Sequence, residues 1–241
     1  MSASTLRAQI ESRHPAAFAW YQRQQGETIL TGISAIDRLT GGIPLQSLSE
    51  ICGSNRSSSG KTSVLVSLLA QASQKYFCAL VDAGDAFDPA TAQSVGVNLS
   101  RLCWVRCGKN RSKFRPLEQA FKAADMLLQN GGFGLIAVDL SQIPEKYVSQ
   151  VPASTWFRFS RVIEKQQGAL VFIGQRHCAT SCAALVLLMK SGTPDLSGSH
   201  LSNHPSNLWT KIPFQAELLR VRDKKPVQAG TPDFSLKTQW A

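Results

Sequence analysis

Short apolar runs alternate with helical stretches from about residue 47 to residue 190. The apolar runs are predicted to be strands, and they lie at 47–52, 77–82, 102–106, 134–139 and 169–174. The stretches between them are predicted to be helices, at 61–75, 89–95, 116–130 and 153–167. Because several strands are apolar throughout rather than alternating, both of their faces must be covered. This alternation with short connections predicts an α/β fold, a mostly parallel sheet flanked by helices.

The N-terminal part of the chain differs from this alternating region. Residues 1–24 contain a short predicted helix that ends at His14-Pro15, because a residue before proline disfavours the helical region. We therefore expect an N-terminal helical arm at 1–30 and a single core domain at 31–241.

The two ends of the core domain are less regular than its centre. A glycine-punctuated stretch near its start holds a short helix around Ile36 and Leu39. Further strands are predicted at 183–189 and 214–222. The segment between these strands is rich in Ser, Gly, Pro and Asn and nearly free of apolar residues, which predicts a mobile loop near 191–210.

Composition limits the class of protein. The chain has 241 residues, 43% of them hydrophobic and 17% charged, enough for a sizeable core. It has no long apolar run and no apolar secretory segment, so we expect a cytoplasmic protein with no membrane partner and with reduced thiols at its six Cys. The net charge of +10 favours an anionic partner, which could be nucleic acid, a nucleotide or an acidic protein surface.

The strongest chemical signal is a small-residue loop between the first predicted strand of the alternating region and the helix at 61–75. Backbone N–H groups of such a loop can curl around phosphate oxygens, and a helix N-terminus favours negative charge. The expected nucleotide-binding residues are Ser58, Ser59, Gly60, Lys61, Thr62 and Ser63. We expect Lys61 to reach the β- and γ-phosphates of ATP, and the Thr62 hydroxyl to ligate Mg²⁺.

The spacing of this loop departs from the usual motif. Six residues separate Gly53 from Gly60, whereas the usual motif has four between its glycines, so Asn55 stands where the first glycine belongs. Asn tolerates a left-handed backbone better than most residues, so the loop can keep its function. The alternative is a serine-rich turn that binds nothing.

A metal-side carboxylate is expected at the end of a later strand. The run 135–138 is apolar and is followed by Asp139, at the carboxyl edge where ligands bind in open α/β sheets. We therefore predict Asp139 as a partner of the Mg²⁺ shell. Its alternative role is to cap the segment that follows the strand.

With these elements placed, the chain resembles the RecA/RadA recombinase superfamily from about Thr31 to Gln175, with a weaker tail to Lys225. The matching blocks are Thr31-Gly32 with Asp37, Leu39, Gly41-Gly42 and Pro44, then Glu50 to Gly53 with Ser58 to Thr62, and Val81 to Pro89 followed by Gly96-Val97. The resemblance implies a RecA-like P-loop NTPase core with ATP and Mg²⁺ as cofactors.

The resemblance also implies roles for single residues. Asp139 matches the family's Walker B acid, Asp88 an adenine-contacting aspartate, and Gln175 the glutamine that senses the γ-phosphate. Arg222 and Lys224 fall where the family places lysines that touch a neighbouring subunit's nucleotide.

Several family features are missing. Gly84 stands where RecA carries the glutamate that activates the attacking water, and glycine can neither orient water nor take a proton. Asp85 is adjacent, but neighbours on a strand-end turn point in different directions. Thr91 replaces the aromatic residue that stacks on the base. The stretches 141–153 and 176–182 are too short to serve as the family's DNA-binding loops.

These departures are similar to those of the short RecA-like accessory proteins called ImuA, or SulA-like. That subgroup implies an accessory role in the SOS response and translesion synthesis through RecA and a Y-family-like, error-prone polymerase, with degenerate or slow ATP turnover. The short arm could also support self-association. Two alternatives stay open: an active ATP-dependent, DNA-binding recombinase of the RecA family, and a SulA-like cell-division inhibitor.

A basic segment offers a second candidate surface. Its residues are Arg101, Arg106, Lys109, Arg111, Lys113 and Arg115, with Trp104 and Phe114 between them. Such a segment could bind DNA nonspecifically through phosphate contacts and ring stacking. The alternative is a solvated loop whose aromatic residues face the core.

Overall fold

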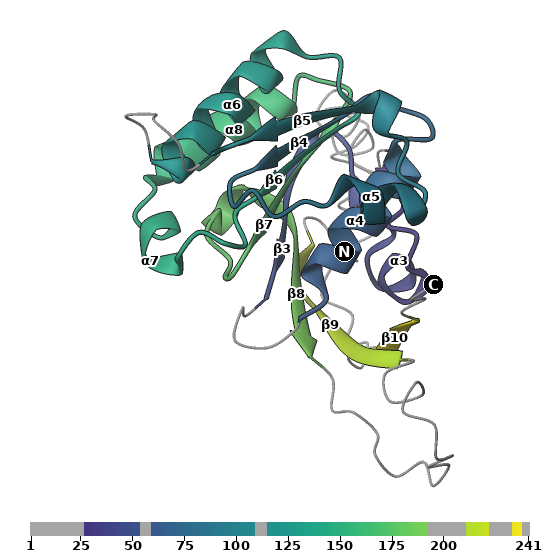
Figure 1. Cartoon of the computed structure of the whole chain (residues 1–241). Coiled ribbons are helices and arrows are strands. Elements are labelled where there is room, and N and C mark those ends of the chain that lie inside the picture. The colour runs from purple at the N-terminus through teal and green to yellow at the C-terminus, as the bar shows by residue number, and fades with distance from the viewer. Residues whose placement is uncertain (1–26, 54–58, 109–114, 192–210, 222–232, 238–241) are drawn as a thin grey trace, which may run out of the picture.

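The computed structural model of the chain describes residues 27–53, 59–108, 115–191, 211–221 and 233–237 (Figure 1). Apart from residues 27–30, the expected N-terminal arm lies outside the described residues. The same holds for the loop expected near 191–210, except for Ser191.

An eight-stranded sheet forms the centre of the molecule, in the order β10-β9-β8-β3-β7-β6-β4-β5 (Figure 1). The strands are β3 Ser47–Cys52, β4 Cys78–Asp82, β5 Leu102–Arg106, β6 Leu135–Asp139, β7 Ala169–Gly174, β8 Ala183–Ser191, β9 Lys211–Val221 and β10 Asp233–Lys237. Neighbours from β8 to β5 pair in parallel, whereas β9 pairs antiparallel with both β8 and β10. The expected α/β fold with a mostly parallel sheet is therefore confirmed.

Helices cover both faces of this sheet (Figure 1). One face carries α3 Ser34–Thr40, α4 Lys61–Ala72 and α5 Pro89–Ser94, and the other carries α6 Pro116–Asn130 and α8 Ala153–Ile163, with the short α7 Glu145–Val148 near its edge. Because β4 and β7 are buried nearly end to end, their largely apolar sequences are explained by this double cover.

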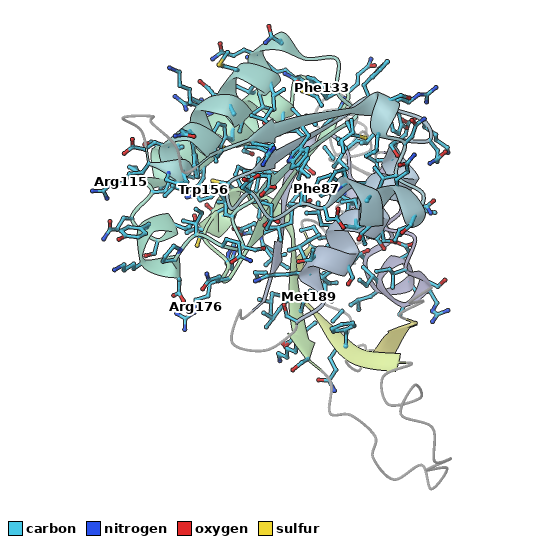
Figure 2. The ribbon with its side chains drawn as sticks, in the orientation of Figure 1. Phe87, Arg115, Phe133, Trp156, Arg176 and Met189 are labelled. Atoms are coloured by element: carbon cyan, nitrogen blue, oxygen red, sulfur yellow. The ribbon has the colours of Figure 1, made fainter. Side chains whose placement is uncertain are left out.

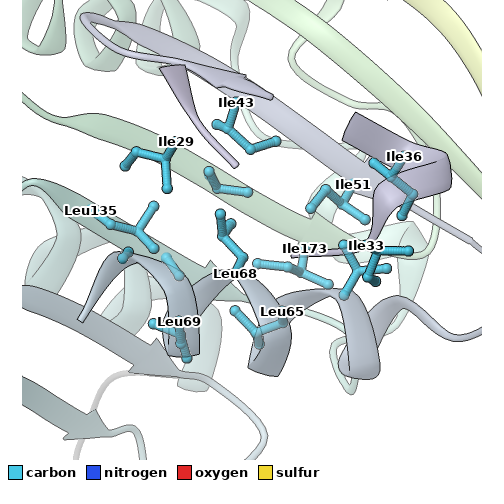
Figure 3. Close-up of a cluster of buried hydrophobic side chains, with 14 of the residues drawn as sticks. Ile29, Ile33, Ile36, Ile43, Ile51, Leu65, Leu68, Leu69, Leu135 and Ile173 are labelled. Carbon is cyan, nitrogen blue, oxygen red and sulfur yellow. The ribbon is translucent and has the colours of Figure 1, made fainter. Parts of the chain in front are cut away.

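Each face has its own buried cluster. Figure 3 shows Leu65 and Leu68 of α4 beside Ile51 and Ile173 of the sheet, all of them buried. On the opposite face, an aromatic group joins α6, α8 and β7, with ring centroids 4.9–5.9 Å apart; its members are Phe121, Trp156, Phe159 and Phe172. The two clusters fix the helices against the sheet and so fix the strand ends that hold the candidate site.

The lead-in to α3 is organised by one carboxylate. Asp37 accepts hydrogen bonds from the Thr31 backbone N–H, the Thr31 hydroxyl and the Gly32 backbone N–H, at 2.7–3.2 Å. Gly32 has a φ of +78°, and a Cβ there would lie 2.9 Å from the Gln71 side chain of α4. Thr31, Gly32 and Asp37 therefore form a turn that packs closely against α4.

Some elements differ from the sequence prediction. The helix predicted at 153–167 ends at Ile163, because the N–H groups of Lys165 and Gln166 bond back only three residues as the chain turns toward Gly168. A Cβ at Gly168 would lie 2.2 Å from the Phe133 carbonyl oxygen. The sequence analysis also missed α7, β10 and the two-residue strands β1 Thr28–Ile29 and β2 Ile43–Pro44. No helix among the described residues is long and apolar enough to cross a membrane.

Candidate nucleotide site

The phosphate loop connects the end of β3 to the start of α4, as the sequence predicted. Gly60 is the N-cap of α4 with φ +75° and ψ 2°, a left-handed conformation that favours glycine. Lys61 is only 5% exposed, and its Nζ donates a 2.6 Å hydrogen bond to the Gly53 carbonyl oxygen. Thr62 and Ser63 in the first turn of α4 are exposed, whereas Ser58 and Asn55 lie outside the described residues. The described part of the loop can therefore present a helix N-terminus, a lysine and two hydroxyls to one ligand.

Two residues from the far end of the chain pack against this loop. A Cβ at Gly53 would lie 2.6 Å from the Met189 carbonyl oxygen, and one at Gly60 would lie 2.7 Å from the Phe214 ring. Figure 2 shows Met189 near the end of β8. Gly53 is thus required by close packing, although it falls outside the usual motif spacing. The sequence does not predict these contacts, because β8 and β9 follow the phosphate loop by more than 100 residues.

Asp139 ends β6 and faces the start of α4. Its carboxylate accepts a 2.8 Å hydrogen bond from the Ser141 backbone N–H. Burial raises the pKa of Asp139, and the Ser141 hydrogen bonds and the nearby Lys61 charge oppose this effect. Burial also lowers the pKa of Lys61, and the Asp139 charge opposes that shift. The charges of the predicted phosphate lysine and metal-side acid therefore stabilise one another in the folded chain.

Two carboxylates beside Gly84 are committed to structural contacts. Asp82 is 1% exposed and accepts from the Ala86 and Phe87 backbone N–H groups, at 3.1 and 2.9 Å. Asp85 has a φ of +52° and makes a two-point ion pair with Arg106 of β5, at 2.7 and 3.0 Å. Asp85 therefore points toward the edge strand, in line with the expectation that it does not replace the missing glutamate.

Gly84 itself is covered by a neighbouring side chain. A Cβ at this position would lie 2.5 Å from both Cβ and Cγ of Gln142, which follows β6. Both residues line a cleft of about 830 Å³ at the carboxyl edge, bounded also by the N-terminus of α6 and by Tyr147 of α7. Sequence reasoning did not single out Gln142, because nothing in its own neighbourhood marks it.

The predicted γ-phosphate sensor lies at the end of β7. Gln175 Nε2 donates hydrogen bonds to the carbonyl oxygens of Ser141 and Ile143, at 3.2 and 3.0 Å. This glutamine therefore holds the segment after Asp139 in place.

Asp88 has a clear local role. Its carboxylate caps α5 by accepting from the Ala90 and Thr91 backbone N–H groups, at 3.1 and 3.3 Å, and from the Thr91 hydroxyl. The hydrogen bond from the Thr91 hydroxyl is the main cause that lowers the pKa of Asp88. The contact with adenine that the family resemblance implies for Asp88 stays a prediction.

The loop after β7 is clamped by a carboxylate that sequence reasoning left unassigned. Glu50 of β3 is 3% exposed and accepts from the Cys178 and Ala179 backbone N–H groups, at 2.9 and 3.0 Å. It also pairs with His177 Nδ1. The sequence signal that could have marked Glu50 is a charged residue inside a predicted strand of the central sheet.

The described members of the basic segment each make contacts of their own. Arg101 lies at the start of β5 and donates to the Gln74 carbonyl oxygen at 2.7 Å, whereas Arg106 lies at the other end of that strand. Arg115 is the N-cap of α6, with its guanidinium 6.0 Å from the Tyr147 ring (Figure 2). Trp104 packs edge-on against Phe87, with ring centroids 5.3 Å apart. Lys109, Arg111, Lys113 and Phe114 lie outside the described residues, as do Arg222 and Lys224.

Comparison with known proteins points to one family. A family model described as the RecA N-terminal domain matches residues 18–147, which is more than half of the chain. Protein RecA of Rickettsia bellii (strain RML369-C) is 37% identical over 116 residues, covering 47% of this chain and 31% of the relative. Protein RecA of Colwellia psychrerythraea is 35% identical over the same length and coverage. The match thus spans about a third of the length of these relatives.

Proposed function

Since the chain belongs to the RecA N-terminal domain family, we propose that it is a RecA-like, nucleotide-binding accessory protein of the DNA damage response with slow ATP turnover. In this role it acts in translesion synthesis, as ImuA-like proteins do, by binding RecA and an error-prone, Y-family-like polymerase. The observation that carries the proposal is a phosphate loop with Lys61 and Asp139 in place beside a position 84 that has no carboxylate.

ATP with Mg²⁺ fits the residues of this site. The exposed hydroxyls of Thr62 and Ser63 and the helix N-terminus behind Gly60 offer donors to phosphate oxygens. Lys61 donates a hydrogen bond to the Gly53 carbonyl oxygen, and a phosphate oxygen could take over this bond. Asp139 and Thr62 supply the oxygen ligands that Mg²⁺ prefers. Bound ATP·Mg²⁺ would supply a phosphoanhydride bond, and this chain would hold its phosphates.

An active, DNA-dependent recombinase is the second candidate function. Similarity to Protein RecA from several bacteria favours it. The carboxylates at 82 and 85 weigh against fast hydrolysis, because both are held by other contacts. Any direct DNA binding in the accessory role would be nonspecific and electrostatic.

Replacing Lys61 tests the nucleotide site. Lys61→Ala is expected to weaken ATP·Mg²⁺ binding by about 1.5–3 kcal/mol, roughly 10- to 150-fold, because it removes a charge-assisted contact to phosphate. Isothermal titration calorimetry measures the affinity, and Lys165→Ala, an exposed cation on the far side of the sheet, is the control. Equal affinity of wild type and Lys61→Ala would contradict the phosphate-loop assignment.

ATP turnover separates the two candidate functions. The accessory role predicts slow turnover that single-stranded DNA does not raise. Robust, DNA-stimulated turnover by the wild type would favour the recombinase instead.

A further inference from the structure

Most carboxylates around the carboxyl edge of the sheet are held by other groups. Besides Asp82 and Asp85, Glu50 is tied to the loop after β7, Asp88 caps α5, and Glu145 lies 3.0 Å from Arg176. Asp139 is the acid expected on the metal side. Glu118, in the first turn of α6, lines the same cleft, whereas the atoms nearest to a Cβ at position 84 all belong to Gln142.

Gln142 is the polar side chain that lies against position 84. It is exposed in the cleft at the end of β6, and its Cβ and Cγ fill the space that a side chain at Gly84 would need. It lies three residues after Asp139, so the strand that carries the metal-side acid also sets the position of this amide.

The backbone on both sides of Gln142 is fixed by a second amide. Gln175 Nε2 bonds to the carbonyl oxygens of residues 141 and 143, the two neighbours of Gln142. Asp139 accepts from the Ser141 N–H on the same segment. The position of Gln142 is thus coupled to the metal-side acid and to the expected γ-phosphate sensor.

We propose that Gln142 orients the attacking water in this nucleotide site, in place of a carboxylate, and that Gln175 positions it. This inference rests on the proposed function, since it requires a bound ATP. Glutamine amides orient water in other nucleotide hydrolases without accepting its proton.

ATP hydrolysis at this site would need no general base from the protein. The water oxygen attacks the γ-phosphorus, the bond to the bridging oxygen breaks, and its electron pair leaves with ADP. The water proton passes to an oxygen of the γ-phosphoryl group. The amide only holds the water, which accounts for slow turnover.

Substitution of Gln142 tests this assignment in the full-length protein. Gln142→Ala is expected to lower single-turnover hydrolysis about tenfold or more, because the water loses its orientation. The same variant should bind ADP with aluminium fluoride, a mimic of the transferring phosphoryl group, about tenfold more weakly, with ADP affinity unchanged. Gln150→Ala, which removes another exposed amide from the same cleft, is the control and should change neither quantity.

Gln142→Glu provides an independent readout. A carboxylate at this position can accept the proton, so turnover should rise about tenfold or more at neutral pH. The gain should vanish as the pH falls below about 5, where a glutamate becomes protonated. A merely structural role for residue 142 would not produce this pH profile.

Two results would overturn the proposal in distinguishable ways. If the wild type binds ADP but both Gln142 variants match it in turnover and in aluminium fluoride affinity, the role of Gln142 is wrong while the proposed function stands. If the wild type binds neither ATP nor ADP, the proposed function is wrong and this inference fails with it.

Discussion

Gly84 has no side chain, and its surroundings leave no room for one. Gln142 lies where a Cβ would be placed, so restoring the family's glutamate is a steric problem as well as a chemical one. A side chain at position 84 therefore requires a smaller residue at position 142.

Gly84→Glu alone is expected to destabilise the fold by about 1–3 kcal/mol through overpacking and to leave ATP turnover unraised. Gly84→Glu combined with Gln142→Gly removes the clash and should raise turnover above that of the wild type. Gly84→Ala, which introduces the clash without a carboxylate, is the control for both. Unfolding by denaturant and steady-state hydrolysis measure the two effects, and a stable, fast Gly84→Glu single variant would refute the steric argument.

At the scale of elements, Glu50 fixes the loop after β7 to β3. Glu50→Ala leaves one buried and one partly buried backbone N–H group without an acceptor, so it should cost about 2–4 kcal/mol of unfolding free energy. Glu145→Ala, which removes a more exposed carboxylate paired with Arg176, should cost under about 1 kcal/mol. Denaturant titration compares the two variants, and equal losses would show that Glu50 does not clamp the loop.

The same contact gives the stability a pH dependence. The hydrogen bond to Glu50 raises the pKa of His177, against the effect of its partial burial. A pKa raised in the folded state stabilises the fold fully below the unfolded value of about 6.5, and that stabilisation is lost as the pH rises through the folded pKa. The stability gap between wild type and Glu50→Gln should therefore be wider at pH 6 than at pH 8.5.

Strands and long helices could be predicted from sequence because each carries its own periodicity. The predicted strands 47–52, 102–106 and 169–174 match the structure residue for residue. The short elements β1, β2 and α7 were missed because they hold too few residues for any period to show. The phosphate loop and Asp139 were marked by local sequence. Gln142, Phe214 and Glu50 became visible only through contacts between distant segments.

At the scale of the whole molecule, the nucleotide site alone does not explain the net charge of +10, which favours an anionic partner. Arg106 is paired with Asp85, and Arg101 donates to the Gln74 carbonyl oxygen, so two of the expected basic residues already have partners within the chain, and nonspecific DNA binding by the basic segment stays a prediction. The expected partner interactions can also involve other parts of the chain. We propose that the N-terminal arm contributes to them, both for RecA binding and for self-association.

RecA binding is expected to depend partly on residues 1–24, since a short amphipathic segment can add an apolar contact through Leu6 and Ile10. Full-length protein should retain RecA on an affinity column more strongly than a chain that starts at Thr31. The double variant Leu6→Ser with Ile10→Ser is the matched test, because it keeps the chain length and removes only the apolar contacts. Equal recovery of RecA by all three proteins would refute the role of the arm. No recovery by any of them would leave the polymerase as the partner to test, in the same three-way comparison.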